Sequence, residues 1–263
     1  MDTPGMELPN DFRQHRLTDV RGIALKHNLA LSRWLGLHAN TEFKARAAIY
    51  HIRRFDLVNA EYWKAQGAPD AVTIYNNAHP LREILFFEFL AATAALRGCV
   101  DSFIQETNCV FQLGLSETRQ DGKTEVTLGT VIKQLKLKKP EAKTLQLLSA
   151  LETSPSNNWF SFLHRLRNTA LHADLYSNSS EARNIGKILN KLQEKSAAGL
   201  LKSKADVEQE MKRDVVFHLD GRDYYITGQI HELAEMTLAW IDAGYVEFAA
   251  DLESPEGVRG PSN

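Results

Sequence analysis

Apolar residues recur at three- and four-residue steps through most of this 263-residue chain, and this helical period constrains the fold more than any other feature. Its longest proline-free example runs from Leu81 to Phe111, and Pro80 before it is typical of the first turn of a helix. A helix of about 30 residues is about 45 Å long. The sequence therefore predicts a mainly all-α protein built around this helix. Its continuous apolar stripe consists of Leu85, Phe89, Ala92, Leu96, Val100 and Phe103.

Capping residues, glycines and prolines predict where the other helices begin and end. Residues 12–66 indicate two or three helices, with a break near residues 36–41 and an end at Gln66. Thr127 is a suitable cap for a short helix, and Pro140 is suited to the first turn of the next one. The further helices are expected at about residues 127–137, 140–152, 158–176 and 228–251.

Both ends of the chain combine Pro, Gly, Ser and Asn with few apolar residues, so residues 1–10 and 254–263 are expected to be disordered tails. Residues 11–79 then form an N-terminal helical segment, and residues 80–253 form a helical domain. That domain includes one small β-hairpin near residues 215–226, where an Asp-Gly pair separates two runs rich in β-branched and aromatic residues.

The formal net charge of −2 argues against a protein that coats nucleic acid over its whole surface, but it leaves local basic patches open. The longest apolar stretch is interrupted by Arg97 and Asp101 before it reaches membrane length, and the start of the chain lacks the pattern of a secretory signal. We therefore expect a cytoplasmic protein without a membrane segment. Two basic runs are either local patches or solvated helix faces: Lys133, Lys136, Lys138, Lys139 and Lys143, and Arg13, Arg16, Arg21, Lys26 and Arg33.

Cys99 and Cys109 lie ten residues apart in the expected long helix, which separates them by about 15 Å and excludes a disulfide between them. Neither has the spacing of a zinc site, so both are expected to be small buried hydrophobic residues, and neither a metal nor a cofactor is predicted. The chain has no Gly-rich phosphate loop, dinucleotide fingerprint or nucleophile elbow. The tryptophans lie in apolar helical patterns and are predicted to be core aromatics: Trp34, Trp63, Trp159 and Trp240.

The helix expected at residues 158–176 contains the one pattern with chemical meaning, in which Arg167 and Asn168 precede His172. Asn168 and His172 are four residues apart on the side away from the apolar stripe, whereas Arg167 is about 140° from His172, at the edge of the stripe. This spread is too wide for a tight site on one helix. Two copies of the helix around a two-fold axis would bring both pairs to one cleft. The stripe, which must face the core, consists of Trp159, Phe162, Leu163, Leu166, Ala170 and Ala173.

The run Arg167-Asn168-Thr169-Ala170-Leu171-His172 resembles the Arg-Asn-x-x-x-His signature of the HEPN superfamily. The match covers the helix from Trp159 to Tyr176, and the order of a long helix, a linking region and a motif helix is similar to the four-helix up-and-down core of that superfamily. Residues 1–79 and 181–226 do not map onto it. The resemblance implies a HEPN-like helical bundle with an N-terminal helical extension. It also implies a metal-independent endoribonuclease that acts as a homodimer, often in toxin–antitoxin or phage-defence systems.

The chemistry of RNA cleavage suits these residue types, because the 2′-hydroxyl attacks the neighbouring phosphorus once a base removes its proton. An imidazole titrates near neutral pH, so His172 is suited to act as base and acid. The planar guanidinium of Arg167 binds phosphate oxygens in pairs and remains charged. Asn168 would orient the histidine or the ribose. The predicted partners are RNA, a second copy of the chain and an antitoxin.

Several nearby residues have two interpretations each. His164 and Arg165 either extend the polar face toward RNA or are plain surface residues. Glu88 and Asp101 interrupt the apolar spine, so a carboxylate there would either pair with Arg167 and hold it in position or lie on an exposed face. Two other functions also remain open: a non-catalytic HEPN-like module that binds RNA or a nucleotide, and a structural interaction protein in which the motif has no role.

Overall fold

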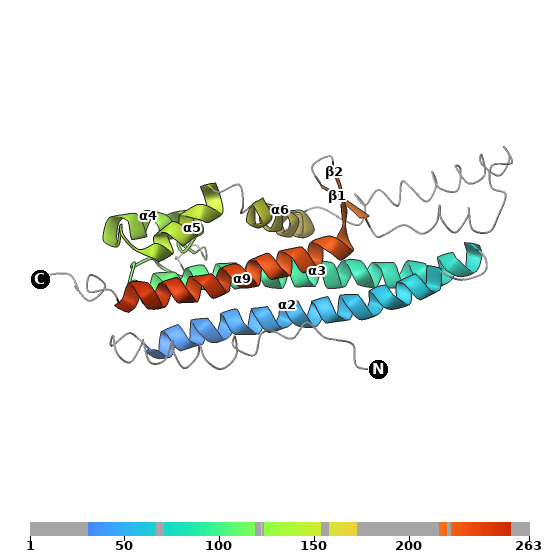
Figure 1. Cartoon of the computed structure of the whole chain (residues 1–263), viewed down its shortest axis with the longest axis horizontal. Coiled ribbons are helices and arrows are strands. Elements are labelled where there is room, and N and C mark those ends of the chain that lie inside the picture. Colours follow the sequence, from blue (N-terminus) through green and yellow to red (C-terminus); the bar gives the residue numbers. More distant parts are fainter. Residues whose placement is uncertain are drawn as a thin grey trace, which may run out of the picture. The chain divides into compact units, whose positions relative to one another are not determined.

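The computed structural model describes residues 31–66, 71–118, 122, 124–153, 158–172, 216–219 and 222–253. These residues are mostly helical, which confirms the prediction of a mainly all-α protein (Figure 1). The described helices are α2 (Leu31–Gln66), α3 (Ala71–Val110), α4 (Leu128–Lys138), α5 (Lys143–Thr153), α6 (Asn158–His172) and α9 (Ile226–Glu253). No helix among them has a stretch long and apolar enough to cross a bilayer.

The chain divides into two compact units, and the long helices contribute to both. The domain boundary predicted between residues 79 and 80 falls inside α3. The described part of the first unit comprises residues 31–48, 95–118, 122, 124–153, 158–164 and 234–253, and that of the second comprises residues 49–66, 71–94, 165–172, 216–219 and 222–233.

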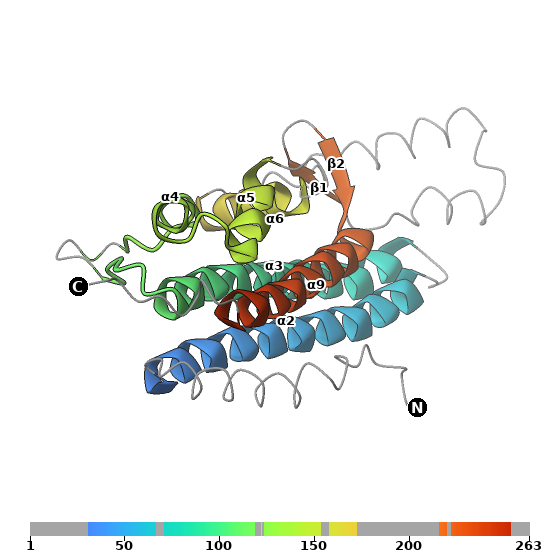
Figure 2. The ribbon, with the colours of Figure 1, turned by 60° about the vertical axis from the view of Figure 1, so that its left-hand side comes forward.

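In the first unit, α2, α3 and α9 lie side by side, as two views show (Figures 1 and 2). Phe103 of α3 is fully buried among aromatic rings of α9. Its ring stacks on Phe248 with 4.6 Å between centroids and meets Trp240 and Tyr245 edge to face at 5.2 Å and 5.4 Å. Gly244 permits this approach, because a Cβ atom at that position would collide with the Phe103 ring.

The two short helices of the first unit begin in different ways. Thr127 caps α4 as predicted: its hydroxyl accepts from the Thr130 amide at 3.3 Å, and its own amide donates to the Thr130 hydroxyl at 2.9 Å. Such a capping box satisfies amide groups that have no partner inside the helix. The helix predicted to open at Pro140 begins later, at Lys143.

The later start of α5 has a cause far away in the sequence. Asp251, near the end of α9, accepts hydrogen bonds from the backbone amides of Lys143 and Thr144, both at 2.8 Å. The carboxylate therefore occupies the capping position that a local Ser, Thr or Asp usually fills. Residues 138–143 alone therefore do not predict where α5 begins, because the carboxylate that caps it is far away in the sequence.

In the second unit, polar pairs join the helices around an apolar core. His51 of α2 lies 2.7 Å from Glu88 of α3, and His231 of α9 lies 2.9 Å from Asp56 of α2. The strands β1 (Val216–Leu219) and β2 (Arg222–Tyr225) pair antiparallel in this unit. The buried apolar residues include Ile52, Phe55, Leu85, Phe89, Ala92, Ile230 and Leu233.

The helical break predicted at residues 36–41 is wrong, because α2 continues through this segment. Gly36 has a weak helix propensity, but tertiary contacts commonly outweigh such preferences. Thr41 is buried here, and its hydroxyl bonds both the Leu37 carbonyl oxygen at 3.4 Å and a carboxylate of α3. Packing of this turn against α3 therefore maintains the helix, and its end at Gln66 is as predicted.

The helix start predicted at Pro80 is also wrong, because α3 begins at Ala71 and contains Pro80 in its interior. An interior proline removes one backbone hydrogen bond and crowds the preceding turn, at a cost of about 3 kcal/mol. Ala78 before it and Leu85 after it are both buried. Burial on both sides of the proline offsets that cost.

The apolar stripe predicted for α3 is confirmed, since every named residue in it is buried. Cys99 is buried and Cys109 half-buried, and both are free thiols, so the prediction of burial holds fully only for Cys99. Among the tryptophans, Trp63 is the exception: it is exposed, whereas Trp34, Trp159 and Trp240 are core residues.

Candidate functional site

Helix α6 carries the sequence motif, and its apolar stripe is buried as predicted wherever its side chains are described. Trp159, Phe162, Leu163 and Leu166 are all buried. The last two predicted stripe residues, at positions 170 and 173, lie outside the described side chains. The helix therefore has one face in the core, and its polar residues are distributed around the rest of its circumference.

The described motif side chains lie at the edge of the core. Arg167 and Asn168 are half-buried, while His164 and Arg165 are exposed. His172 is the last described helical residue of α6, and its side chain lies outside the described part. Along a regular helix, Arg167 and His172 are about 7.5 Å apart in height and about 140° apart in direction.

Arg167 has no hydrogen-bond or ion-pair partner among the described residues. A half-buried guanidinium has lost part of its hydration. An anion that accepts hydrogen bonds from several of its N–H groups compensates this loss best. A phosphate oxygen pair is such an acceptor. This arrangement gives α6 a cationic group that is suited to bind a phosphate.

The predicted supporting carboxylates have other basic partners. Glu88 accepts from His51 at 2.7 Å and from Arg54 at 3.3 Å. Asp101 pairs with Arg97 one turn earlier, at 2.9 Å. Neither carboxylate pairs with Arg167 in the part of the chain that the structure describes.

Asp101 nevertheless contributes to the environment of α6 through Arg97. The guanidinium carbon of Arg97 lies 4.8 Å from the centroid of the Phe160 ring, over its face. This is a cation–π contact between α3 and the first half of α6. The ion pair with Asp101 fixes the guanidinium in that position.

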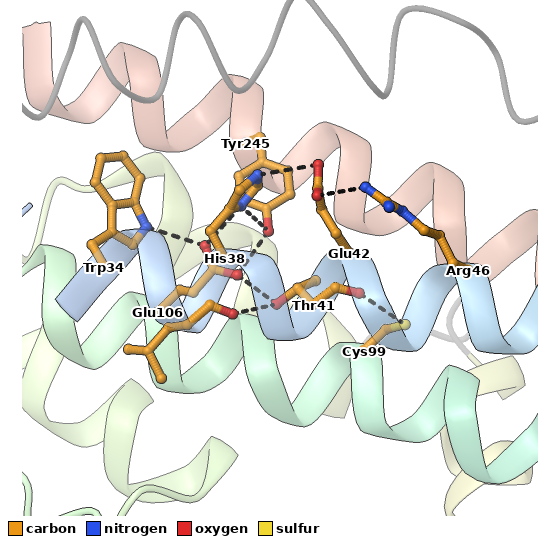
Figure 3. A network of polar contacts seen from close by, with 9 residues as sticks. Trp34, His38, Thr41, Glu42, Arg46, Cys99, Glu106 and Tyr245 are labelled. Atoms are coloured by element: carbon orange, nitrogen blue, oxygen red, sulfur yellow. Dashed lines mark hydrogen bonds and ion pairs between the residues drawn. The ribbon is translucent and has the colours of Figure 1, made fainter. Parts of the chain in front are cut away.

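A buried polar cluster that was not predicted from the sequence lies between α2, α3 and α9 in the first unit (Figure 3). Glu106 of α3 is fully buried at its centre. Its Oε1 accepts from Thr41 at 2.5 Å and from Tyr245 at 2.8 Å, and its Oε2 accepts from the Trp34 indole at 3.1 Å. Nδ1 of His38 lies 3.3 Å from the same Oε2.

His38 connects this cluster to a second carboxylate. Nδ1 of His38 is 2.9 Å from the Tyr245 hydroxyl oxygen, which accepts from it because Tyr245 donates its own proton to Glu106. Nε2 of His38 lies 4.0 Å from Glu42, which in turn binds Arg46 at 3.0 Å. Burial, and then the negative charge and hydrogen bond of Glu106, raise the pKa of Tyr245 well above its usual value, so the tyrosine remains a donor.

The sequence did contain a signal for this cluster. Glu106 follows Phe103 by three residues and therefore continues the apolar stripe of α3, where an acidic residue must find donors. Trp34, His38 and Thr41 follow one another at steps of four and three residues on α2 and share one face of that helix. The prediction named only Glu88 and Asp101 as acidic residues of this stripe, and Glu106 was missed.

Each basic run has a side chain with a structural contact, and it is Lys138 in the first run and Arg33 in the second. Lys138 donates to the carbonyl oxygens of Gln112 and Leu113 at 3.1 Å and 2.9 Å, which ties the end of α4 to the loop after α3. Arg33 pairs with Glu117 at 2.7 Å. The arginines and lysine at positions 13–26 lie outside the described residues.

The described residues contain no group of His, Cys, Asp and Glu side chains arranged to hold a metal ion. Comparison of the chain with protein-family models, with curated proteins and with solved structures finds no match.

Proposed function

We propose that this protein is a metal-independent endoribonuclease of the HEPN type, with Arg167, Asn168 and His172 as its catalytic residues. The observation that carries the proposal is the half-buried Arg167, which has no anionic partner among the described residues and lies on the same helix as the predicted histidine. The helical architecture and the buried stripe of α6 support it further.

In the proposed reaction, two copies of α6 face each other across a two-fold axis and share one RNA strand. His172 of one copy removes the proton from a ribose 2′-hydroxyl, whose oxygen attacks the neighbouring phosphorus. The P–O5′ bond breaks, and His172 of the second copy returns a proton to the leaving 5′-oxygen. The products are a 2′,3′-cyclic phosphate and a 5′-hydroxyl.

The remaining residues bind and orient the RNA in this scheme. Arg167 binds the non-bridging phosphate oxygens and stabilises their growing negative charge, while Asn168 orients the imidazole or the ribose. His164 and Arg165, exposed one turn earlier, extend the contact along the RNA backbone. Such an enzyme acts on cytoplasmic RNA, as a toxin restrained by an antitoxin or as a phage-defence nuclease.

The test compares cleavage of a mixed RNA pool with EDTA present by the wild type and by single variants. His172→Ala is expected to lower the rate by about 10²–10⁴-fold and Arg167→Ala by about 10²–10³-fold, with unchanged helical content. Arg46→Ala is the matched control, because this exposed arginine of α2 pairs with Glu42 and is not part of the motif. A 2′-deoxy substitution at the cleaved nucleotide should block the reaction.

The outcomes separate the alternatives. A wild type that leaves diverse RNAs intact, or a His172→Ala variant that cuts equally well, contradicts the enzymatic proposal. If the intact RNA still binds, and Arg167→Ala weakens that binding while Arg46→Ala does not, the protein is instead a non-catalytic RNA- or nucleotide-binding module on the same helical scaffold. If Arg167→Ala changes neither RNA cleavage nor RNA binding, the protein is a structural interaction protein in which the motif has no role.

A further inference from the structure

One face of α2 in the second unit is exposed along its whole described length. The residues of this face follow one another at steps of three and four, which is the spacing of a seam between two packed helices. We call this face the α2 seam; it consists of Tyr50, Arg53, Arg54, Leu57, Ala60, Glu61 and Lys64, all of them exposed.

The α2 seam contains large apolar side chains at its centre. Leu57 and Tyr50 are 57% and 58% exposed, and they lie seven residues apart on the same side of the helix. Isolated exposed apolar residues are ordinary, but two at heptad spacing within a continuous exposed face are typical of a helix that packs against a partner. Ala60 is small and allows close approach beside Leu57.

The charges of the α2 seam indicate which partner fits. Arg53 lies four residues before Leu57, and Glu61 lies four residues after it. In an antiparallel pair of identical helices with a two-fold axis at Leu57, each residue before Leu57 faces the residue equally far after it on the second copy. Arg53 of each copy then faces Glu61 of the other. A parallel pair would instead place arginine beside arginine.

A second antiparallel match supports the same register. Tyr50 lies seven residues before Leu57, and Lys64 lies seven residues after it. The antiparallel arrangement therefore places the Lys64 ammonium of one copy against the Tyr50 ring of the other, which is a favourable cation–π pair. Within its own helix Lys64 binds Glu61 at 2.6 Å, so the two residues form one exposed polar pair beside the apolar centre.

We infer that the α2 seam binds a second copy of this chain, antiparallel, with Leu57 of both copies at the two-fold axis. The seam is separate from the motif on α6 and does not depend on the proposed ribonuclease activity. A protein that used both surfaces would form a tetramer, and one that used the α2 seam alone would form a dimer.

The first experiment measures the mass of the full-length protein by light scattering and sedimentation, from about 1 to about 300 µM, a range suited to micromolar association. The wild type is expected to be an even-numbered oligomer at the upper concentrations. Leu57→Glu is expected to halve that mass, because it places two carboxylates at the axis, and to weaken association by roughly a hundredfold or more. Leu137→Glu is the matched control, since Leu137 of α4 is equally apolar and 71% exposed.

A charge exchange tests the register. Arg53→Glu is expected to weaken association by about tenfold, because two attractive pairs become repulsive. The double variant Arg53→Glu with Glu61→Arg restores both pairs and should regain most of the lost affinity. Positions 53 and 61 are about 12 Å apart along one helix, so they do not compensate each other within a single chain.

A cysteine variant provides an independent measurement. Leu57→Cys should form a disulfide-linked dimer on mild oxidation, whereas Leu137→Cys should not. A wild type that stays monomeric at every concentration overturns the proposal, including the case in which another part of the same chain covers the seam. The proposal is also overturned if Leu57→Glu leaves the mass of the oligomer unchanged. It is likewise overturned if the double variant Arg53→Glu with Glu61→Arg does not regain the affinity lost in Arg53→Glu.

Discussion

Replacement of Glu106 tests whether the buried polar cluster holds α2, α3 and α9 together. The two carboxylate oxygens accept from Trp34, Thr41 and Tyr245, and His38 lies beside them. Glutamine has the same shape, but an amide group replaces one acceptor oxygen. The hydroxyls of Thr41 and Tyr245 can turn to accept from that amide, whereas the indole of Trp34 can only donate.

The expected loss in the free energy of unfolding follows from the number of donors that bind the carboxylate. A hydrogen bond to a charged group contributes about 1.5–3 kcal/mol and one between neutral groups about 0.5–1.5 kcal/mol. Because the oxygen of a glutamine can keep Trp34 and His38, Glu106→Gln should lower the free energy of unfolding by about 1–3 kcal/mol. Glu106→Ala removes every acceptor and should cost about 3–5 kcal/mol. At about 2–4 °C per kcal/mol, the alanine variant loses about 6–20 °C in Tm.

Urea denaturation and thermal melting followed by circular dichroism measure both variants. Glu117→Gln is the control, because Glu117 forms a partly exposed ion pair with Arg33 at 2.7 Å and should cost no more than about 1 kcal/mol. If Glu106→Ala is no less stable than this control, or if glutamine costs more than alanine, the cluster does not hold the helices as described.

Three further outcomes are expected. The hydrogen bond that His231 donates to Asp56, and then the charge of Asp56, raise the pKa of His231 above 6.5 against the effect of burial, so this pair stabilises the fold below that pH and the stabilisation is lost as the pH rises through the raised value. Asp56→Asn should therefore cost up to about 1 kcal/mol near pH 5.5 and almost nothing near pH 9 in urea denaturation; equal costs would contradict this. Because the pKa of Tyr245 is raised above 10.0, its stabilisation is present below pH 10 and is lost at higher pH, and Tyr245→Phe should flatten the alkaline decline of Tm seen in the wild type. Burial raises the pKa of Cys99 to about 12, so iodoacetamide at neutral pH should modify the half-buried Cys109 first, and mass spectrometry that finds Cys99 modified first in the folded protein would refute its burial.

Helical periodicity predicted the elements of this fold well because it depends on residues close together in the sequence. The cap at Thr127 and the end of α2 at Gln66 were predictable for the same reason. Pro80 and the segment at residues 36–41 were misjudged, since local propensity favours helix ends there. Contacts with other helices decided both cases, and a single stretch of sequence does not show them.

Of the candidate site, the position of the arginine could be predicted from the sequence, but the partners of the two carboxylates were not. The position of Arg167 at the edge of the buried stripe follows from its spacing to Leu163 and Leu166, and the structure agrees with it. The partner of Glu88 did not follow from spacing, because His51 lies on another helix. The pair of Arg97 and Asp101 has the spacing of one helical turn and was missed only because Arg97 was considered as a break in an apolar run. Which charges meet depends on helix packing, and the motif alone does not encode that.

The carboxylate of Asp251 on the first amides of α5 links the start of one helix to a residue 108 positions later. At about 5–20 residues per second, the ribosome needs about 5–20 s to add those residues. During that interval only water can accept the amide protons that Asp251 later binds, and an isolated helix of 11 residues is marginal in water. The nascent chain is therefore expected to complete the first turn of α5 only after α9 has been made.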